Sequence, residues 1–134
     1  MSSTTTSLPR PPPAKTTVAH SIHDAVQHAD IIFTIIATDA VSIETVSTAL
    51  QAARGLKGKL WVESSTADLA TVIKLAAMVE EGGGDFLAMS VFGAAGIAIA
   101  GQLVCVPAGP KRCINKFRPF LDGAMGVSTI DMSD

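Results

Sequence analysis

A continuous apolar run from Ile31 to Ala37 limits the possible folds of this chain more than any other feature. Most of its residues are β-branched, and polar residues do not alternate with apolar ones, so the pattern is typical of a strand buried on both faces. Two further strands are predicted over residues 59–63 and 85–91, and helical stripes separate the three segments. Strands and helices that alternate in this way predict an α/β fold, a mostly parallel sheet with helices on both faces.

Side chains with helix-capping oxygens predict where the helices begin. Ser21 opens a capping box, and Asp39 is predicted to cap the helix that follows the first strand. Ser65 or Thr66 is predicted to cap the helix after the second strand, and the glycines of residues 82–84 end that helix. Each of the two later helices therefore follows a strand directly, as a βαβ unit requires.

The C-terminal third continues the same alternation of strands and helices. A short strand is predicted over residues 103–106, and a closing strand over residues 127–130. A last helix lies between them, because apolar residues recur there at helical spacing. These residues are Ile114, Phe117, Leu121 and Met125.

The first 15 residues differ in composition from the rest. They are rich in serine and threonine, and four of the five residues 9–13 are proline, so we expect a disordered tail followed by one domain over residues 16–134. Two cysteines are too few for a disulfide scaffold, which favours the cytoplasm. A mitochondrial location is the alternative, because Arg10 and Lys15 precede the first acidic residue, Asp24.

Charge and hydropathy exclude several classes of partner. The net charge is −2 and basic residues form no block, so no nucleic acid is expected to bind. No apolar run approaches the roughly 20 residues that span a membrane, so no membrane partner is expected. The three histidines have no cysteine or carboxylate that completes a ligand set, so no metal site is predicted.

Small polar residues and glycines cluster where the predicted strands end, over residues 37–39, 64–66 and 90–96. Ligands bind beyond the carboxyl ends of the strands in parallel sheets, so these segments form the candidate site. Two roles stay open for residues 64–66, because their hydroxyls and N–H groups suit either a bound anion or an ordinary helix cap. Glu63 ends a strand beside them, but a single carboxylate predicts no chemistry.

Five segments together resemble the 3-hydroxyisobutyrate dehydrogenase and 6-phosphogluconate dehydrogenase-like family of β-hydroxyacid dehydrogenases. They are residues 29–34, 55–66, 84–87, 100–103 and 108–109. The resemblance runs from about Thr17 to the C-terminus and implies a Rossmann-like domain that binds NAD or NADP. It also implies a small-molecule hydroxyacid as the substrate of an active member.

The resemblance implies roles for six residues. Thr38 would border the ribose and phosphates of the cofactor, and Ser65 and Thr66 would lie toward its nicotinamide ring. The segment of residues 90–96 would correspond to the family's substrate loop. The substrate-binding residues implied there are Phe92, Gly93 and Ala94.

The sequence also departs from the family pattern. The family opens with a strand and a G-x-G-x-x-G turn that binds the pyrophosphate, and this sequence contains no such turn. The family's substrate loop carries a serine where Phe92 stands here. The family's catalytic lysine belongs to a second, helical domain, which would begin where this chain ends, at Asp134. We therefore expect a partial Rossmann-like domain whose first βαβ part is missing, with no catalytic residue of its own.

Three functions follow from this expectation. The first is an oxidoreductase that binds NAD or NADP weakly and is inactive alone. The second is a non-catalytic interaction module, and the third is the remnant of a truncated dehydrogenase gene. A strand edge left uncovered by the missing part predicts a homo-oligomer or a partner subunit.

Overall fold

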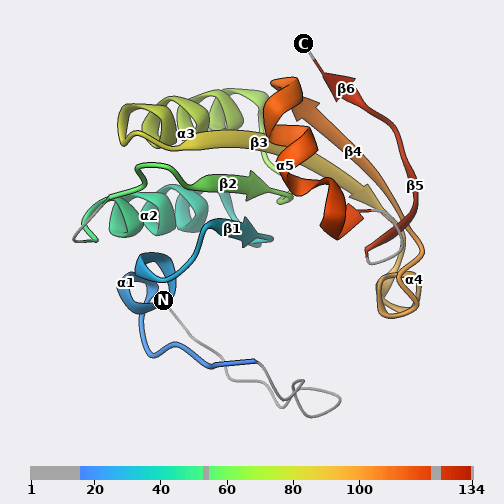
Figure 1. Ribbon diagram of the computed structural model, residues 1–134, viewed down its shortest axis with the longest axis horizontal. Coiled ribbons are helices and arrows are strands. Elements are labelled where there is room, and N and C mark those ends of the chain that lie inside the picture. The colour runs from blue at the N-terminus through green and yellow to red at the C-terminus, as the bar shows by residue number, and fades with distance from the viewer. Residues whose placement is uncertain (1–15, 53–54, 122–124, 134) are drawn as a thin grey trace.

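The structure is a computed structural model that describes residues 16–52, 55–121 and 125–133 (Figure 1). Within these residues six strands form one sheet in the order β1-β2-β3-β4-β5, and β6 lies beside β4 as well. The strands are β1 (Ile31–Thr34), β2 (Leu60–Glu63), β3 (Asp85–Phe92), β4 (Leu103–Gly109), β5 (Gly126–Thr129) and β6 (Met132–Ser133). The predicted tail of residues 1–15 lies outside the described residues.

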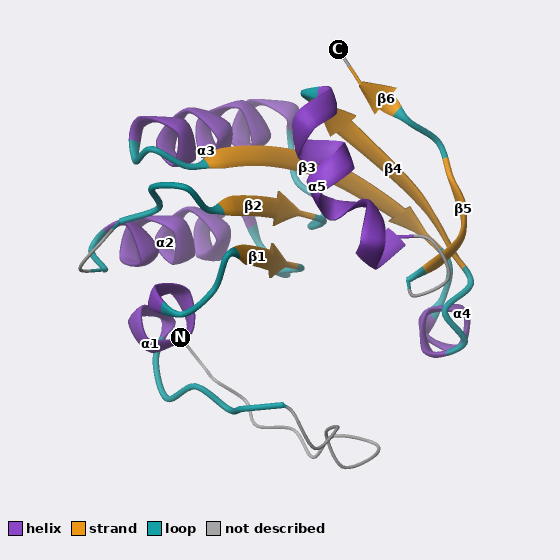
Figure 2. Cartoon of the chain, in the orientation of Figure 1, coloured by secondary structure: helices purple, strands orange, loops and turns teal. Residues whose placement is uncertain are grey.

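Helices cover both faces of the sheet (Figure 2). On one face α2 packs beside α3, and α1 packs beside α2. On the other face α5 packs against β3 and β4. The helices are α1 (Ile22–Gln27), α2 (Asp39–Leu50), α3 (Leu69–Glu81), α4 (Ala95–Ile99) and α5 (Lys111–Leu121).

The parallel arrangement predicted from the sequence is confirmed for the first three strands. β1 pairs with β2 and β2 pairs with β3, both in parallel, and the connections between them contain α2 and α3. β3 and β4 are antiparallel, so one pair departs from the parallel pattern. An antiparallel pair needs only a short connection, and the short helix α4 suffices there.

Two apolar clusters hold the layers together. The cluster between the sheet and α5 consists of Leu60, Val62, Leu87, Met89, Leu103, Cys105, Cys113, Ile114, Phe117 and Leu121. The cluster on the opposite face consists of Val26, Val46, Ala49, Ala52, Leu56, Trp61, Leu75, Val79 and Phe86. Successive residues of β2 enter opposite clusters, because side chains alternate along a strand. All four residues of β2 are therefore buried.

The first strand is shorter and less buried than predicted. β1 ends at Thr34, and the backbone N–H of Ile36 instead donates to Ser65 Oγ at 2.7 Å. The prediction of a strand through Ala37 was wrong, because the ladder with β2 ends at Thr34 and Glu63 and the N–H of Ser64 donates back to the C=O of Thr34 at 2.8 Å. β1 pairs with β2 alone and forms an edge of the described sheet, so Phe33 remains 39% exposed.

The structure confirms one predicted helix-capping residue, and two other predicted caps were wrong. Ser21 caps α1, since its hydroxyl oxygen accepts from the Asp24 N–H at 3.0 Å. Thr38 caps α2 in place of Asp39, which is the first helical residue. Asp68 precedes α3, so Ser65 and Thr66 do not cap it.

The C-terminal third follows the prediction with different boundaries. β4 continues to Gly109, and the closing strand is β5. Met125 lies beyond α5 and packs against its apolar cluster, so its place in the predicted helix was wrong. The sequence analysis also missed β6, which consists of only two exposed residues and carries no strand pattern.

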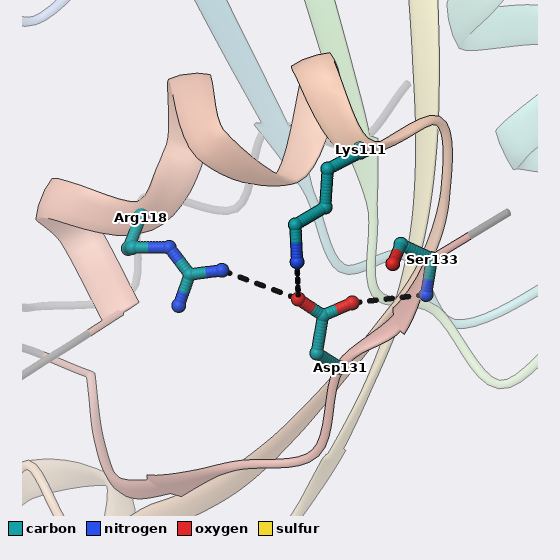
Figure 3. Close-up of polar contacts among 4 residues, drawn as sticks. All are labelled: Lys111, Arg118, Asp131 and Ser133. Atoms are coloured by element: carbon teal, nitrogen blue, oxygen red, sulfur yellow. Dashed lines mark hydrogen bonds and ion pairs between the residues drawn. The ribbon is translucent and has the colours of Figure 1, made fainter.

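Asp131 joins the C-terminal strands to α5 (Figure 3). Its carboxylate accepts from Lys111 Nζ at 2.6 Å, from Arg118 Nη2 at 3.2 Å and from the N–H of Ser133 at 2.9 Å. The hydrogen bonds from Lys111 and Ser133 lower the pKa of Asp131 from 3.8 to about 2. The charged form of this carboxylate therefore favours the folded state.

Asp131→Asn is expected to lower the stability of the protein at neutral pH. The folded-state pKa lies below the unfolded value, so the contribution of Asp131 is complete above about pH 4 and is lost as the pH falls toward 2. Urea unfolding at a series of pH values measures this contribution to the free energy of unfolding. Glu44→Gln, at an exposed residue of α2, is the control. A destabilisation by Asp131→Asn that stays the same from pH 7 to pH 2 would contradict this account.

Candidate functional site

A cavity of about 730 Å³ opens where β1, β2 and β3 end. The arrowheads of these three strands point the same way, so their carboxyl ends share one side of the sheet (Figure 1). The start of α3 and the loop that precedes it complete the wall. The residues that line the cavity are Ile35, Ile36, Ala37, Glu63, Ser64, Ser65, Thr66, Ala67, Val72, Ala88, Met89, Ser90, Val91 and Phe92.

A buried carboxylate organises the floor of the cavity. Glu63 ends β2 and is only 3% exposed. Its Oε2 accepts from the hydroxyl of Thr34 at 2.9 Å, and its Oε1 accepts from the N–H of Ser65 at 2.9 Å. Each carboxylate oxygen therefore has a protein donor, as a buried charge needs.

Two further hydrogen bonds extend this network through the sheet. The indole N–H of Trp61, a buried residue of the opposite core, donates to Thr34 Oγ1 at 3.1 Å. Beyond the end of β1, the N–H of Ile36 donates to Ser65 Oγ at 2.7 Å. The network thus ties the ends of β1 and β2 together and commits most of the polar groups of Ser65 to the protein itself.

Ser64 carries a polar atom that the network leaves out. The residue is 7% exposed, it lines the cavity, and no described residue forms a hydrogen bond with its Oγ. A buried hydroxyl without a partner costs free energy, of the order of 1–3 kcal/mol. Its hydrogen-bonding capacity is therefore unused by the described residues. The Oγ of Ser42 is likewise buried and unpartnered, but it belongs to α2 and does not line the cavity.

Three of the six residues singled out in the sequence line the cavity, and three do not. Ser65, Thr66 and Phe92 line it. Thr38 lies outside it, and its hydroxyl oxygen accepts from the N–H of Val41 at 3.3 Å. Gly93 and Ala94 follow Phe92 beyond the end of β3, between that strand and α4.

Gly93 has a structural reason to be glycine. Its φ angle is 144°, a backbone conformation that side chains with a Cβ rarely adopt. A Cβ there would lie 2.8 Å from Ile97 Cγ2 and 2.9 Å from Leu103 Cδ2. The residue therefore lets α4 and the start of β4 approach the end of β3.

The site also contains Glu63 and Ser64, which the sequence analysis placed at the strand ends without giving either a role in binding. The printed sequence holds a weak signal for them, a carboxylate that ends an apolar strand and is followed by hydroxyl side chains. The hydrogen-bond partner of Glu63 from the neighbouring strand is Thr34, 29 residues earlier in the chain. Sequence spacing gives no measure of such a contact, so the pairing emerges only from the sheet.

A second carboxylate links the beginnings of α2 and α3. Asp39 Oδ2 accepts from the hydroxyl of Thr71 at 2.7 Å and from the N–H of Asp68 at 3.4 Å. The first turn of a helix favours negative charge because its N–H groups are unpaired. Asp39 supplies that charge for both helices, so an incoming anion meets a carboxylate at these helix ends.

The part of the chain that the structure describes contains neither a metal-ligand cluster nor a membrane-spanning helix. No group of three or more histidine, cysteine or acidic side chains is placed to hold a metal ion there. No described helix is long and apolar enough to span a membrane. Cys105 and Cys113 are free and buried, and burial raises the pKa of both thiols.

Comparison with known proteins gives concordant results. The model of the NAD binding domain of 6-phosphogluconate dehydrogenase matches residues 3–132. The NADH-dependent oxidoreductase ucdB of Aspergillus ustus is 30% identical to this chain over 106 residues, which are 79% of this chain and 36% of that protein. The chain thus spans about a third of the length of this curated relative.

Solved structures of the same fold include complexes with small molecules. A 3-hydroxyisobutyrate dehydrogenase of Mycobacterium tuberculosis, solved with L-serine, superposes with a TM-score of 0.78 at 26% identity over 84% of this chain and 38% of that one. A variant imine reductase of Myxococcus stipitatus, solved with NAD⁺, gives a TM-score of 0.75 at 22% identity over 86% of this chain and 39% of that one. The second likeness concerns the fold alone.

Thr34→Val is expected to destabilise the protein by about 1–2 kcal/mol, because it leaves the buried Trp61 N–H without an acceptor and the Oε2 of Glu63 without a donor. Thr34→Ser keeps the hydroxyl and is expected to retain most of that stability. Urea unfolding monitored by Trp61 fluorescence measures both variants. Equal stability of the valine and serine variants would show that the hydroxyl network is not what holds the strand ends.

Proposed function

The chain belongs to the family of the NAD binding domain of 6-phosphogluconate dehydrogenase, and we propose that the cavity at the ends of β1, β2 and β3 binds the nicotinamide end of NAD or NADP. The observation that carries the proposal is the cavity wall, where the exposed residues Thr66 and Ser90 each present a hydroxyl group. A carboxamide has both a donor and an acceptor for such a group. The position agrees with the rule that ligands bind beyond the carboxyl ends of parallel strands.

The residues around the cavity fit the nicotinamide end of the cofactor better than its phosphates. Thr66 is exposed at the cavity wall, so its hydroxyl is available to a ligand, whereas the Ser64 hydroxyl is buried. Ser65 supports the wall through its bonds to Glu63 and Ile36, so we assign it a positioning role. Thr38 stands at the start of α2, outside the cavity, where the ribose and phosphates would pass.

This chain offers few hydrogen-bond donors to the phosphates of the cofactor. The sequence contains no G-x-G-x-x-G turn, whose backbone N–H groups bind a pyrophosphate. The start of α3 already holds the Asp39 carboxylate, which repels a second anion. We therefore propose that the chain binds the cofactor weakly, through the nicotinamide end.

When bound, the nicotinamide supplies or accepts a hydride. The chain's own residues bind the ring and hold it at the sheet, and we assign none of them the transfer of a proton. The ligand that exchanges the hydride would lie beside Phe92, Gly93 and Ala94 at the end of β3. Because the chain spans only 36–39% of the length of the relatives described, turnover of a small molecule is a proposal for the assembly in which it acts.

A separate surface supports association with a second copy of this chain. β1 forms an open edge of the described sheet, and beside it lies an apolar groove of about 380 Å³. The groove residues are Ile31, Phe33, Phe117, Phe120 and Met125. Unpaired N–H and C=O groups next to exposed apolar side chains form a template for another strand. A two-fold axis would pair β1 with its own copy, since an antiparallel pair of identical strands is self-complementary.

The free cysteines agree with a reducing compartment. Both thiols are buried and unlinked, and their raised pKa values keep them protonated. Such thiols persist where glutathione keeps cysteines reduced. We accordingly propose the cytoplasm as the compartment of this chain.

The purified chain is expected to bind NADH and NADPH with a dissociation constant of about 1 mM or weaker, because several charge-assisted hydrogen bonds to phosphate, at about 1.5–3 kcal/mol each, are missing. Energy transfer from Trp61, the single tryptophan and part of the cavity's network, to the reduced nicotinamide reports binding at this site. A dissociation constant in the low micromolar range would contradict the proposed weak site.

A matched pair of variants locates the binding. Ala67→Glu places a carboxylate in the cavity wall and is expected to weaken cofactor binding by about threefold or more through charge repulsion. Ala70→Glu places the same charge on the exposed start of α3, outside the cavity residues, and is expected to change binding less. Equal effects of the two variants would place the cofactor elsewhere.

Self-association through β1 is expected to depend on apolar character at the sheet edge. Ile35, just beyond β1, is 62% exposed, and Ile99 on α4 is 67% exposed, so the two make a matched pair. Ile35→Lys is expected to shift the chain toward monomer, because a charge at an edge strand opposes pairing, and Ile99→Lys is not. Light-scattering chromatography over a concentration series measures this. A wild-type chain that stays monomeric throughout would refute the proposed dimer.

A further inference from the structure

The part of the cavity at the end of β3 is walled by apolar side chains. Met89, Val91 and Phe92 belong to β3, and Val72 of α3 lies among the other lining residues. Phe92 is the largest of them at the mouth of the cavity and is 60% exposed. Its ring therefore offers an apolar surface that an incoming molecule can cover, which favours binding by about 25 cal/mol for each Å² removed from water.

The same cavity holds a negative charge and no described positive one. Among the described residues that line it there is no lysine, arginine or histidine, and Glu63 is the only charged side chain. Both oxygens of Glu63 already accept hydrogen bonds from the protein. A carboxylate that entered here would lose water, meet no cation and face a fixed like charge, each of which opposes binding.

Two backbone donors beside the cavity are committed to the protein. The N–H of Ser65 donates to Glu63, and the N–H of Ile36 donates to Ser65 Oγ. The polar groups left at the cavity wall include the hydroxyls of the exposed residues Thr66 and Ser90. Hydroxyls donate or accept single hydrogen bonds, which suits an uncharged alcohol or carbonyl group.

From these observations we infer that the molecule bound beside Phe92 is an uncharged, largely apolar alcohol or carbonyl compound, and that this site rejects hydroxyacids. The inference rests on the proposed function, because it names the ligand class of the same cavity. Phe92 is the residue that sets the preference, since it supplies apolar contact and no donor for a carboxylate. The hydroxyacid expected from the family resemblance is thereby replaced by a neutral ligand.

The test uses two probes with the same acyl group, methyl 3-hydroxyisobutyrate and 3-hydroxyisobutyrate at pH 7, of which the first is uncharged and carries one additional methyl group. Their affinities for the full chain are measured by NMR titration of assigned amide and methyl signals. The ester is expected to bind about tenfold more tightly than the acid, with shifts at Met89, Val91 and Phe92. Equal binding of the two probes, tighter binding of the acid, or no binding of the ester overturns the inference.

Two serine variants separate the role of Phe92 from a loss of folding. Phe92→Ser is expected to abolish most of the ester's advantage, while Ile130→Ser, which removes an exposed apolar side chain outside both this cavity and the groove, is expected to keep it. Far-UV circular dichroism verifies the fold of both. An ester preference that survives in Phe92→Ser overturns the assignment to this residue.

The cofactor titration on the same samples distinguishes the two proposals. Measurable NADH binding with no preference for the ester refutes the ligand class and leaves the cofactor site standing. An ester preference without any NADH binding refutes the proposed cofactor site and leaves a neutral-ligand pocket. Each result therefore counts against one proposal only.

Discussion

The cavity depends on a buried carboxylate at the end of β2. Glu63 is charged and almost fully enclosed, so it needs a donor on each oxygen, and Thr34 and Ser65 supply them. Thr34 in turn accepts from Trp61 in the core of the opposite face. The ends of two parallel strands are thereby fixed to each other and to the core. The cavity beyond them keeps its shape because the polar groups of its floor, Glu63 and Thr34, form hydrogen bonds within the protein.

The hydrogen bonds that hold the strand ends also determine which ligands the cavity is able to bind. Ser65 follows a strand, where an anion-binding loop would be expected, but its N–H and its Oγ serve the protein. What is left is a wall of single hydroxyls and apolar side chains around one negative charge. This chemistry suits a carboxamide and a neutral ligand, and it opposes phosphates and carboxylates. The proposed weak cofactor site and the proposed neutral ligand thus have one physical origin.

The two sides of the described sheet differ: the strands beyond β3 pack with α5, whereas β1 forms an edge with unpaired backbone groups. Beyond β3 the antiparallel β4, with β5 and β6, is tied to α5, and Asp131 joins the last strands to that helix. At the other side β1 has a single neighbour, and Phe33 stacks on Phe117 of α5 with 6.0 Å between the ring centroids. Apolar surface and unpaired backbone groups coincide there. A partner strand at that edge would add a strand to the sheet beside β1 and cover the groove.

The sequence by itself determined the alternation of strands and helices and the parallel order of β1, β2 and β3, because side-chain periodicity is a local property. It also pointed to the strand ends, and Ser65, Thr66 and Phe92 do line the cavity. It did not determine where β1 ends or which hydroxyl is left without a partner. Those features depend on contacts between segments about 30 residues apart, such as that of Thr34 with Glu63. Only the tertiary structure decides them, since a hydrogen bond depends on distance in space and not on spacing along the chain.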